Sequence, residues 1–210
     1  MTLGQLLFFL PSAFLLAVAP GPDNLGVLAL GVSRGRNEAL GFALGAASGC
    51  LNHTLLAVLG ISALIAASPL AFQALQYAGA AYLIWIGLQA LRSRGASLAK
   101  LNAPSAANGF APYFKRGLIA NAINPKVALF FLAFLPQFVR PGAWSTAAQI
   151  ATFGALFTLA AALVFGAIAL SAARLGRWLR GRERLTVWLD RMTGGLFIAL
   201  GLKLATAHIR

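Results

Sequence analysis

The chain has 210 residues, of which 60% are hydrophobic and 10% are charged. This composition excludes an ordinary soluble domain and indicates an integral membrane protein. The net charge of +13 does not point to a nucleic-acid partner, because most Lys and Arg residues lie in short clusters between apolar runs. We therefore expect membrane lipid, and no nucleic acid, as the surroundings of this chain.

Apolar runs of about 20 residues are long enough to cross a bilayer as helices. Six such runs predict an all-α integral membrane fold with six transmembrane helices. The expected spans are residues 4–32, 39–66, 70–91, 117–139, 147–172 and 187–206.

The first span is interrupted by Pro20, Gly21 and Pro22, followed at once by Asp23 and Asn24. Each proline lacks an N–H donor, and its ring clashes with the carbonyl four residues earlier, so the helix breaks here. A broken helix that carries a carboxylate at membrane depth is costly. We therefore expect it to serve function.

Basic residues divide unevenly between the connections. Heavy clusters follow the first span (Arg34 and Arg36), the third (92–116) and the fifth (174–191), whereas the connections between them carry few positive charges. Positive charge marks cytoplasmic loops. This pattern predicts a multi-pass protein with both its N- and C-termini outside.

The second half repeats the break of the first, because Asn124, Pro125 and Lys126 again place a charge directly after a proline in an apolar run. Three spans in each half require the two repeats to be inverted. Paired broken helices in inverted halves indicate the binding site of a secondary transporter. The expected units are a first repeat at 1–91, a cytoplasmic basic linker at 92–116 and a second repeat at 117–210.

Asp23 and Lys126 are expected at similar depth. Asp23 precedes Arg34 by eleven residues, roughly 16 Å of helix, and Lys126 follows Arg116 by ten, roughly 15 Å. Both fall near the middle of the bilayer. The two charges could form a purely structural salt bridge, or a zwitterion site in which Asp23 takes an ammonium group, and a proton, while Lys126 takes a carboxylate.

Amide and imidazole groups accompany the two breaks. Asn24, Asn121 and Asn124 could satisfy backbone groups that the prolines leave unpaired, contact a ligand, or do both. His53 could be a hydrogen-bonded residue between helices or a proton relay.

Small residues on the second span give it a face for close packing. Gly41, Gly45 and Gly49 recur every four residues, and His53 continues the series, so all four share one side of a helix. Tyr82 on the third span is a candidate cavity-lining residue, although aromatic residues near span ends usually mark the bilayer interface.

We expect no cofactor, no metal site and no enzymatic activity. Asp23, Cys50 and His53 are too few for a transition-metal site. The His-Glu-x-x-His and Gly-x-x-x-x-Gly-Lys patterns of catalytic and nucleotide sites do not occur in the sequence.

These motifs, in this order, resemble the LysE/RhtB family of bacterial amino-acid exporters. The resemblance is strong over the first four spans and rests on hydropathy and length over the last two. The matching segments are Pro20–Asn24, His53, Tyr77–Leu83, Asn121 with Asn124–Lys126 and Ala128, and Leu135–Phe138.

The resemblance implies export of an amino-acid-like substrate from the cytoplasm, driven by protons, across the bacterial inner membrane. It also allows a homodimer. From the residues alone, a passive channel or a small-cation exporter stays open as an alternative, as does a structural protein that uses its glycine faces for packing.

Overall fold

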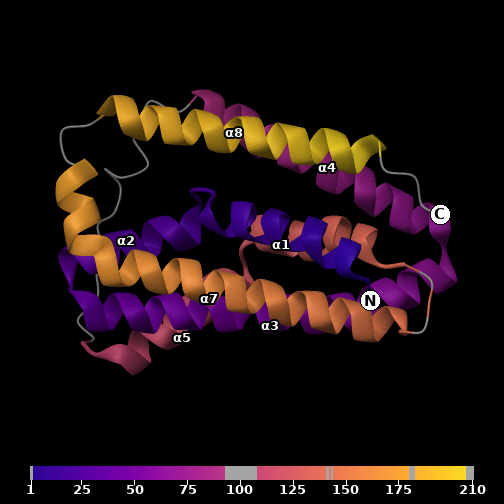
Figure 1. The fold of residues 1–210 in the computed structure, drawn as a ribbon, viewed down its shortest axis with the longest axis horizontal. Coiled ribbons are helices and arrows are strands. Elements are labelled where there is room, and N and C mark those ends of the chain that lie inside the picture. The colour runs from indigo at the N-terminus through magenta and orange to yellow at the C-terminus, as the bar shows by residue number, and fades with distance from the viewer. Residues whose placement is uncertain (1, 93–107, 141, 143, 180–182, 207–210) are drawn as a thin grey trace.

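The computed structural model describes residues 2–92, 108–140, 142, 144–179 and 183–206, and the elements in these ranges are helices (Figure 1). The helices of the first half are α1 (Leu3–Val18), α2 (Pro22–Ser33), α3 (Arg36–Ala67) and α4 (Pro69–Arg92). Those of the second half are α5 (Phe110–Ala122), α6 (Pro125–Leu129), the π-helix η2 (Phe130–Phe134), the 3-10 helix η3 (Leu135–Phe138), α7 (Thr146–Leu179) and α8 (Glu183–Thr206).

Both expected helix breaks are present. The axis bends by 50° between α1 and α2, and by 50° between α5 and the segment Pro125–Phe138. In each case a proline occupies the first turn of the helix that follows, where its missing N–H has no partner to lose. The prediction from the proline positions is thus confirmed at both sites.

The helices form a bundle with a separate outer pair. α3 packs along α5 and α7, and α2 contacts both α3 and α7. α1 also packs on α7. α4 packs mainly against α8, and Figure 1 shows these two side by side along one edge of the molecule. The segment α6–η2 contacts both α3 and α4, so the second broken helix lies where the bundle meets the outer pair.

Close helix contacts rest on glycine, as the spacing in α3 predicted. A methyl group on Gly41 or Gly45 of α3 would overlap the backbone carbonyl of Phe110 or Phe114 on α5. Gly117 of α5 approaches the backbone of α3 in the same way. Without a driving force from water inside a bilayer, such close contact supplies much of the attraction between helices.

The number of spans is three to five by length and composition. Arg36–Gly60, Leu70–Arg92 and Thr146–Trp178 qualify alone, and each bent pair qualifies when its two halves are taken together. α8, which holds the span expected at 187–206, is not among the candidates. The six-span arrangement therefore stays a prediction.

The fourth expected span starts earlier than the expected residue 117. Most of the linker expected at 92–116 lies outside the described residues, and its last part is helical because α5 begins at Phe110. Gly109 allows this start with a positive φ of 96°, and its N–H donates to Glu38 Oε1 at 3.2 Å. Tyr113 is fully buried in the first turns of α5, so packing against the bundle extends the helix into the basic stretch.

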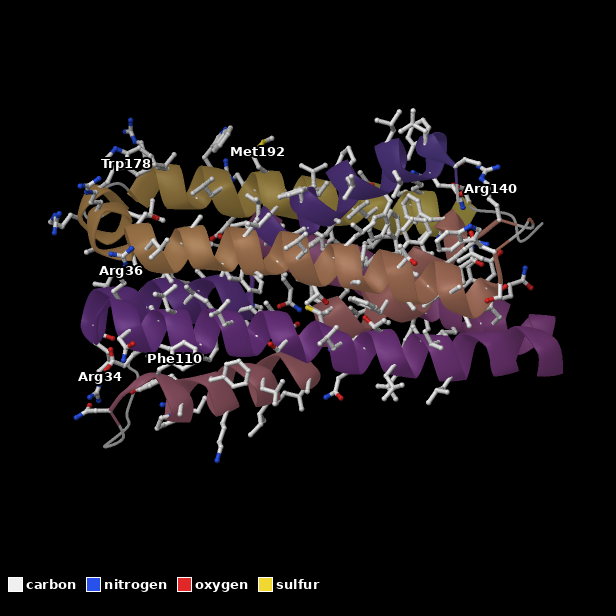
Figure 2. All side chains as sticks on the ribbon, turned by 60° about the horizontal axis from the view of Figure 1, so that its bottom comes forward. Arg34, Arg36, Phe110, Arg140, Trp178 and Met192 are labelled. Carbon is white, nitrogen blue, oxygen red and sulfur yellow. The ribbon has the colours of Figure 1, made fainter. Side chains whose placement is uncertain are left out.

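The two ends of the bundle differ in charge. In Figure 2, Arg34 and Arg36 lie at one end together with Phe110 and Trp178, and Arg140 lies at the opposite end. α1 begins and α8 finishes at the end opposite to that of Arg34 and Arg36 (Figure 1). Arg34 and Arg36 thus lie at the end of the bundle opposite to Arg140, and the orientation in the membrane stays a prediction.

Candidate functional site

The first break exposes carbonyl groups at the end of α1. In a continuous helix the Val18 carbonyl would accept from residue 22, which is a proline without an N–H. Asn24 supplies the missing donor, since its Nδ2 lies 2.7 Å from the Ala17 carbonyl oxygen and 3.3 Å from that of Val18. Gly21 is extended, with φ −169° and ψ 179°, and leads into α2. Asn24 therefore closes the end of the helix that precedes it.

The second break repeats this chemistry with a different donor. Pro125 lacks the N–H that the Asn121 carbonyl would accept in a continuous helix. That oxygen instead accepts from the Asn124 backbone N–H at 2.9 Å, and His53 Nε2 also lies 2.9 Å from it. A carbonyl only accepts, so His53 carries its proton on Nε2 and donates. Asn124 caps α6, because its Oδ1 accepts from the Lys126 backbone N–H at 3.1 Å. Of the two roles expected for His53, the hydrogen bond between helices is present.

The carboxylate of Asp23 joins the two breaks. Its Oδ2 accepts from Asn121 Nδ2 at 2.7 Å and from Asn124 Nδ2 at 2.9 Å. Asp23 is 3% exposed and Asn121 is completely buried. Asp23 also lies in the first turn of α2, where the positive end of the helix dipole favours an anion. Side chains of the two breaks therefore touch at this carboxylate, through Asn121 and Asn124.

Lys126 reaches across to the first break, yet not to the carboxylate. Its Nζ donates to the Ala19 carbonyl at 2.8 Å and lies 5.4 Å from the centre of the Phe197 ring. Within the described part of the chain, no ion pair joins Lys126 to Asp23. Lys126 lies in the first turn of α6, where the positive end of the helix dipole disfavours a cation. Its side chain extends to Ala19 at the C-terminal end of α1, where the negative end of the dipole favours one.

Two glycines make room for this crossing. A Cβ atom on Gly21 would lie 3.0 Å from Lys126 Nζ. A Cβ atom on Gly49 would lie 2.8 Å from Asn121 Oδ1 and 2.7 Å from Asn121 Cβ. Gly21 thus admits the lysine, whereas Gly49 lets Asn121 lie beside Asp23. Gly49 belongs to the site as well as to the packing face of α3.

Other predicted residues lie apart from these contacts. Gly41 and Gly45 pack against the backbone of α5, and Pro20 forms part of the connection between α1 and α2. Tyr82 is half-buried, with its ring 5.4 Å from that of Trp85 on the same helix. None of its recorded contacts within the described ranges is to a residue of the breaks.

Sequence reasoning missed one neighbour of Lys126 and the aromatic contacts of the π-helix. Phe197 faces Lys126 from α8, and a phenylalanine within an apolar helix gives no signal of such a contact. The aromatic surroundings of the π-helix were also missed. The Phe130 ring is tilted against Phe157 of α7 with centres 4.7 Å apart, and Phe131 meets Phe157 edge-on at 5.2 Å. Phe130 also lies near Phe9 of α1. These contacts depend on tertiary packing.

The arrangement can hold a positively charged group. A buried carboxylate with two amide donors on one oxygen keeps its other oxygen, Oδ1, without a hydrogen-bond partner among the described residues. Such an oxygen can accept a proton or an ammonium group. Since both breaks contribute to the same contact, a change in either helix end alters the surroundings of the carboxylate.

Comparison with known proteins gives one family. Residues 14–208 match the model described as LysE type translocator. An uncharacterized membrane protein of Pseudomonas aeruginosa is 35% identical over 196 residues, covering 90% of this chain and 89% of its own. The homoserine/homoserine lactone efflux protein of Salmonella typhimurium is 32% identical, with 95% of each chain covered. A leucine efflux protein of an Enterobacter species is 29% identical, covering 95% of this chain and 94% of its own. No solved structure matches the chain significantly.

Proposed function

Because the chain belongs to the LysE-type translocator family, we propose that it is a secondary transporter that exports amino acids or close derivatives from the cytoplasm. Two similar proteins are named for efflux of homoserine, its lactone or leucine. The observation that carries the proposal is the Asp23 carboxylate, which is buried where two broken helices meet and keeps one oxygen unpartnered. Intramembrane charges at helix breaks are typical of transporter binding sites.

Transport is driven by proton antiport with alternating access. Asp23 is the exchangeable group, since Oδ1 can hold either a proton or the ammonium group of the substrate. Asn121 and Asn124 keep the carboxylate in place through Oδ2 while Oδ1 changes its partner. A proton and the ammonium group of the substrate cannot occupy Oδ1 at the same time. A proton that enters from outside therefore displaces the substrate, which is released outward.

The architecture behind this function is six spans in two inverted repeats. One support for this architecture is that both broken pairs bend by 50°. A second support is that each broken helix packs on the helix after the break of the other half: α5 packs on α3, and α1 and α2 pack on α7. The repeats are 1–91 and 117–210, connected by the linker 92–116. The homodimer is proposed from the resemblance to the family alone.

The protein resides in a bacterial inner membrane, with both termini outside. The relatives include bacterial membrane proteins. The basic end marked by Arg34 and Arg36 faces the cytoplasm and its anionic lipid (Figure 2). The opposite end, near Arg140, faces outward.

The test is efflux from cells or inverted vesicles with three variants. Asp23→Asn removes the charge at constant size, and Lys126→Ala removes the donor to Ala19, so both should abolish efflux while the protein stays in the membrane. Lys203→Ala is the matched control, because Lys203 faces the Phe134 ring outside the breaks and should export normally. Normal efflux by both site variants would refute the assignment.

An uncoupler separates this transporter from a passive channel. Collapse of the proton gradient should stop net efflux against a concentration gradient. Flux that continues unchanged after the gradient is collapsed would instead indicate a channel.

A further inference from the structure

Five buried phenylalanine rings lie between the two breaks and the end of the bundle marked by Arg140. α1 runs from that end to the first break, and the segment α6–η3 runs from the second break back to it. Each of the five rings lies within 6.3 Å, centre to centre, of another. We call them the ring layer, and its members are Phe9 of α1, Phe130 of η2, Phe138 of η3, and Phe153 and Phe157 of α7.

Two buried glutamines join the same three segments beyond the ring layer. Gln5 of α1 donates from Nε2 to the Phe138 carbonyl of η3 at 2.8 Å and to Gln149 Oε1 of α7 at 2.9 Å. Gln5 precedes Phe9 by four residues, and Gln149 precedes Phe153 by four, so each lies about one turn closer to the end of the bundle. We call this pair the glutamine latch, because it holds the end of η3 against α1 and α7.

The two glutamines differ in what their hydrogen bonds connect. Gln149 Nε2 donates to the Arg140 carbonyl at 2.8 Å, and the Arg140 N–H donates to Gln149 Oε1 at 3.2 Å. These bonds lie within the second half of the chain and satisfy backbone groups just beyond η3. The bonds of Gln5 instead cross from the first half to the second. An apolar side chain could fill the same space without burying an amide, so a fixed contact alone does not account for Gln5.

The segment that the latch holds has an irregular helical geometry. The Leu135 N–H donates to the Phe130 carbonyl, five residues earlier, and the chain then tightens into the 3-10 helix η3. Pro136 lacks the N–H that an α-helix would direct to Leu132. A change of helix type within a span often marks a hinge or a functional site. The outer half of the second broken helix is therefore suited to bending.

The inner halves of the broken helices are held in a different way. Gly41 and Gly45 of α3 bring its surface against the backbone of α5, and a methyl group on Gly31 of α2 would overlap Ala172 of α7. Separation there would break close packing between helix backbones. At the other end, η2 and η3 meet α1 and α7 through rings and amides. Side chains can change rotamer, and amides can exchange their partners for water at a small net cost.

We propose that the glutamine latch and the ring layer form the outer gate of the transporter, and that η2 and η3 move away from α1 and α7 to release the substrate. This inference rests on the proposed function, which requires the site to open to each side in turn and places the Arg140 end outside. It adds the segment that moves and the residues that hold it. Gln5 and Gln149 set the fraction of the protein that is closed toward the outside, without touching the substrate.

The experiment measures the half-saturating substrate concentration from each side of the membrane. Right-side-out vesicles loaded with unlabelled leucine or homoserine receive the labelled amino acid outside, and inverted vesicles give the value for the cytoplasmic side. The apparent affinity from one side falls with the fraction of protein that is closed to that side. A variant with a weakened latch should therefore bind substrate more tightly from outside.

Gln5→Leu removes the hydrogen bonds to Phe138 and Gln149 and should favour the open gate by about tenfold, because two neutral hydrogen bonds are lost. The outer half-saturating concentration should fall by about threefold to tenfold, while the cytoplasmic value should rise or stay constant. Gln149→Leu should shift both values in the same directions. A purely structural role would lower the maximal rate and leave both concentrations unchanged.

Gln76→Leu is the matched control. Gln76 of α4 is also a buried glutamine, and its Nε2 donates to the Leu204 carbonyl of α8 at 2.6 Å. This bond joins two helices near the same end of the bundle (Figure 1), but neither helix belongs to the gate. Gln76→Leu should therefore change neither half-saturating concentration.

The outcomes separate the gate from the function beneath it. Transport of neither amino acid by the unmodified protein would refute the proposed function, and the gate with it. Transport with an unchanged outer value in both latch variants, or with an equal fall in Gln76→Leu, would overturn the gate alone. If the leucine variants do not fold, Gln5→Asn and Gln149→Asn decide by the same criterion, because they keep the amide and shorten the side chain.

Discussion

Substitution of Gly49 by alanine tests the site without changing any charged or hydrogen-bonding group. The new Cβ atom would lie 2.7 Å from Asn121 Cβ and 2.8 Å from Asn121 Oδ1. Carbon atoms in contact prefer about 3.5 Å or more, so Asn121 must retreat by roughly 0.8 Å. Asn121 lies at the end of α5, next to the break, and movement there carries its amide away from Asp23.

The size of the effect follows from one hydrogen bond. Asn121 Nδ2 now lies 2.7 Å from Asp23 Oδ2. A retreat of that size would bring the distance to about 3.5 Å, where little hydrogen-bond energy remains. Loss of a hydrogen bond to a charged group costs about 1.5–3 kcal/mol, which corresponds to roughly a tenfold to hundredfold loss of efflux. The gain in helix propensity from alanine offsets about 0.5–1 kcal/mol in stability, so the folded protein should survive.

The assay measures efflux of labelled leucine from vesicles together with the thermal unfolding of the purified variant. Gly60→Ala on the same helix is the control, because a Cβ atom there meets no atom within 4 Å. It should export normally and should be stabilised slightly by the helix propensity of alanine. Equal efflux by Gly49→Ala and Gly60→Ala would refute the claim that the position of Asn121 controls the site.

Three other substitutions probe the framework. Asn24→Ala leaves the Ala17 carbonyl unpaired and should lower the unfolding free energy by about 1–3 kcal/mol, while the KM for leucine in transport assays stays unchanged. Gly87→Ala places a methyl group 2.7 Å from the Gly194 carbonyl and should destabilise the α4–α8 pair by about 1–3 kcal/mol in thermal unfolding, without changing the selectivity of any remaining efflux. Tyr113→Phe removes a buried hydroxyl that has no hydrogen-bond partner. Burial of an unpaired hydroxyl costs free energy of folding, so the variant should keep or raise the melting temperature.

The helix breaks could be predicted from the sequence because proline acts locally. Pro22 and Pro125 remove backbone N–H donors at fixed positions in the chain, whatever packs around them. The π-helix Phe130–Phe134 could not be predicted in this way, because its wider turn lies within a cluster of aromatic rings from α1 and α7. The start of α5 at Phe110 likewise depends on the burial of Tyr113, which outweighs the loop-like composition just before it.

The meeting of the two breaks could be predicted, but the pairing of donors and acceptors could not. Equal spacing from charged edges placed Asp23 and Lys126 at similar depth. Opposite charges at equal depth would favour an ion pair between Asp23 and Lys126. In the structure, Lys126 Nζ instead donates to the Ala19 carbonyl. The deciding factor is the Ala19 carbonyl at the negative end of α1. Lys126 can reach this carbonyl only because α6 packs close to the end of α1, and that packing cannot be predicted from the sequence.

Structural and functional roles at the breaks need not compete, because different atoms serve them. Every proline that breaks a helix leaves carbonyls without donors, and the donors of Asn24, His53 and Lys126 serve carbonyls at the two breaks. Asp23 satisfies no freed carbonyl, since a carboxylate can only accept. Oδ2 of the carboxylate joins the two breaks through Asn121 and Asn124, whereas Oδ1 has no partner among the described residues. The architecture therefore uses one oxygen of Asp23, and the proposed transport role uses the other.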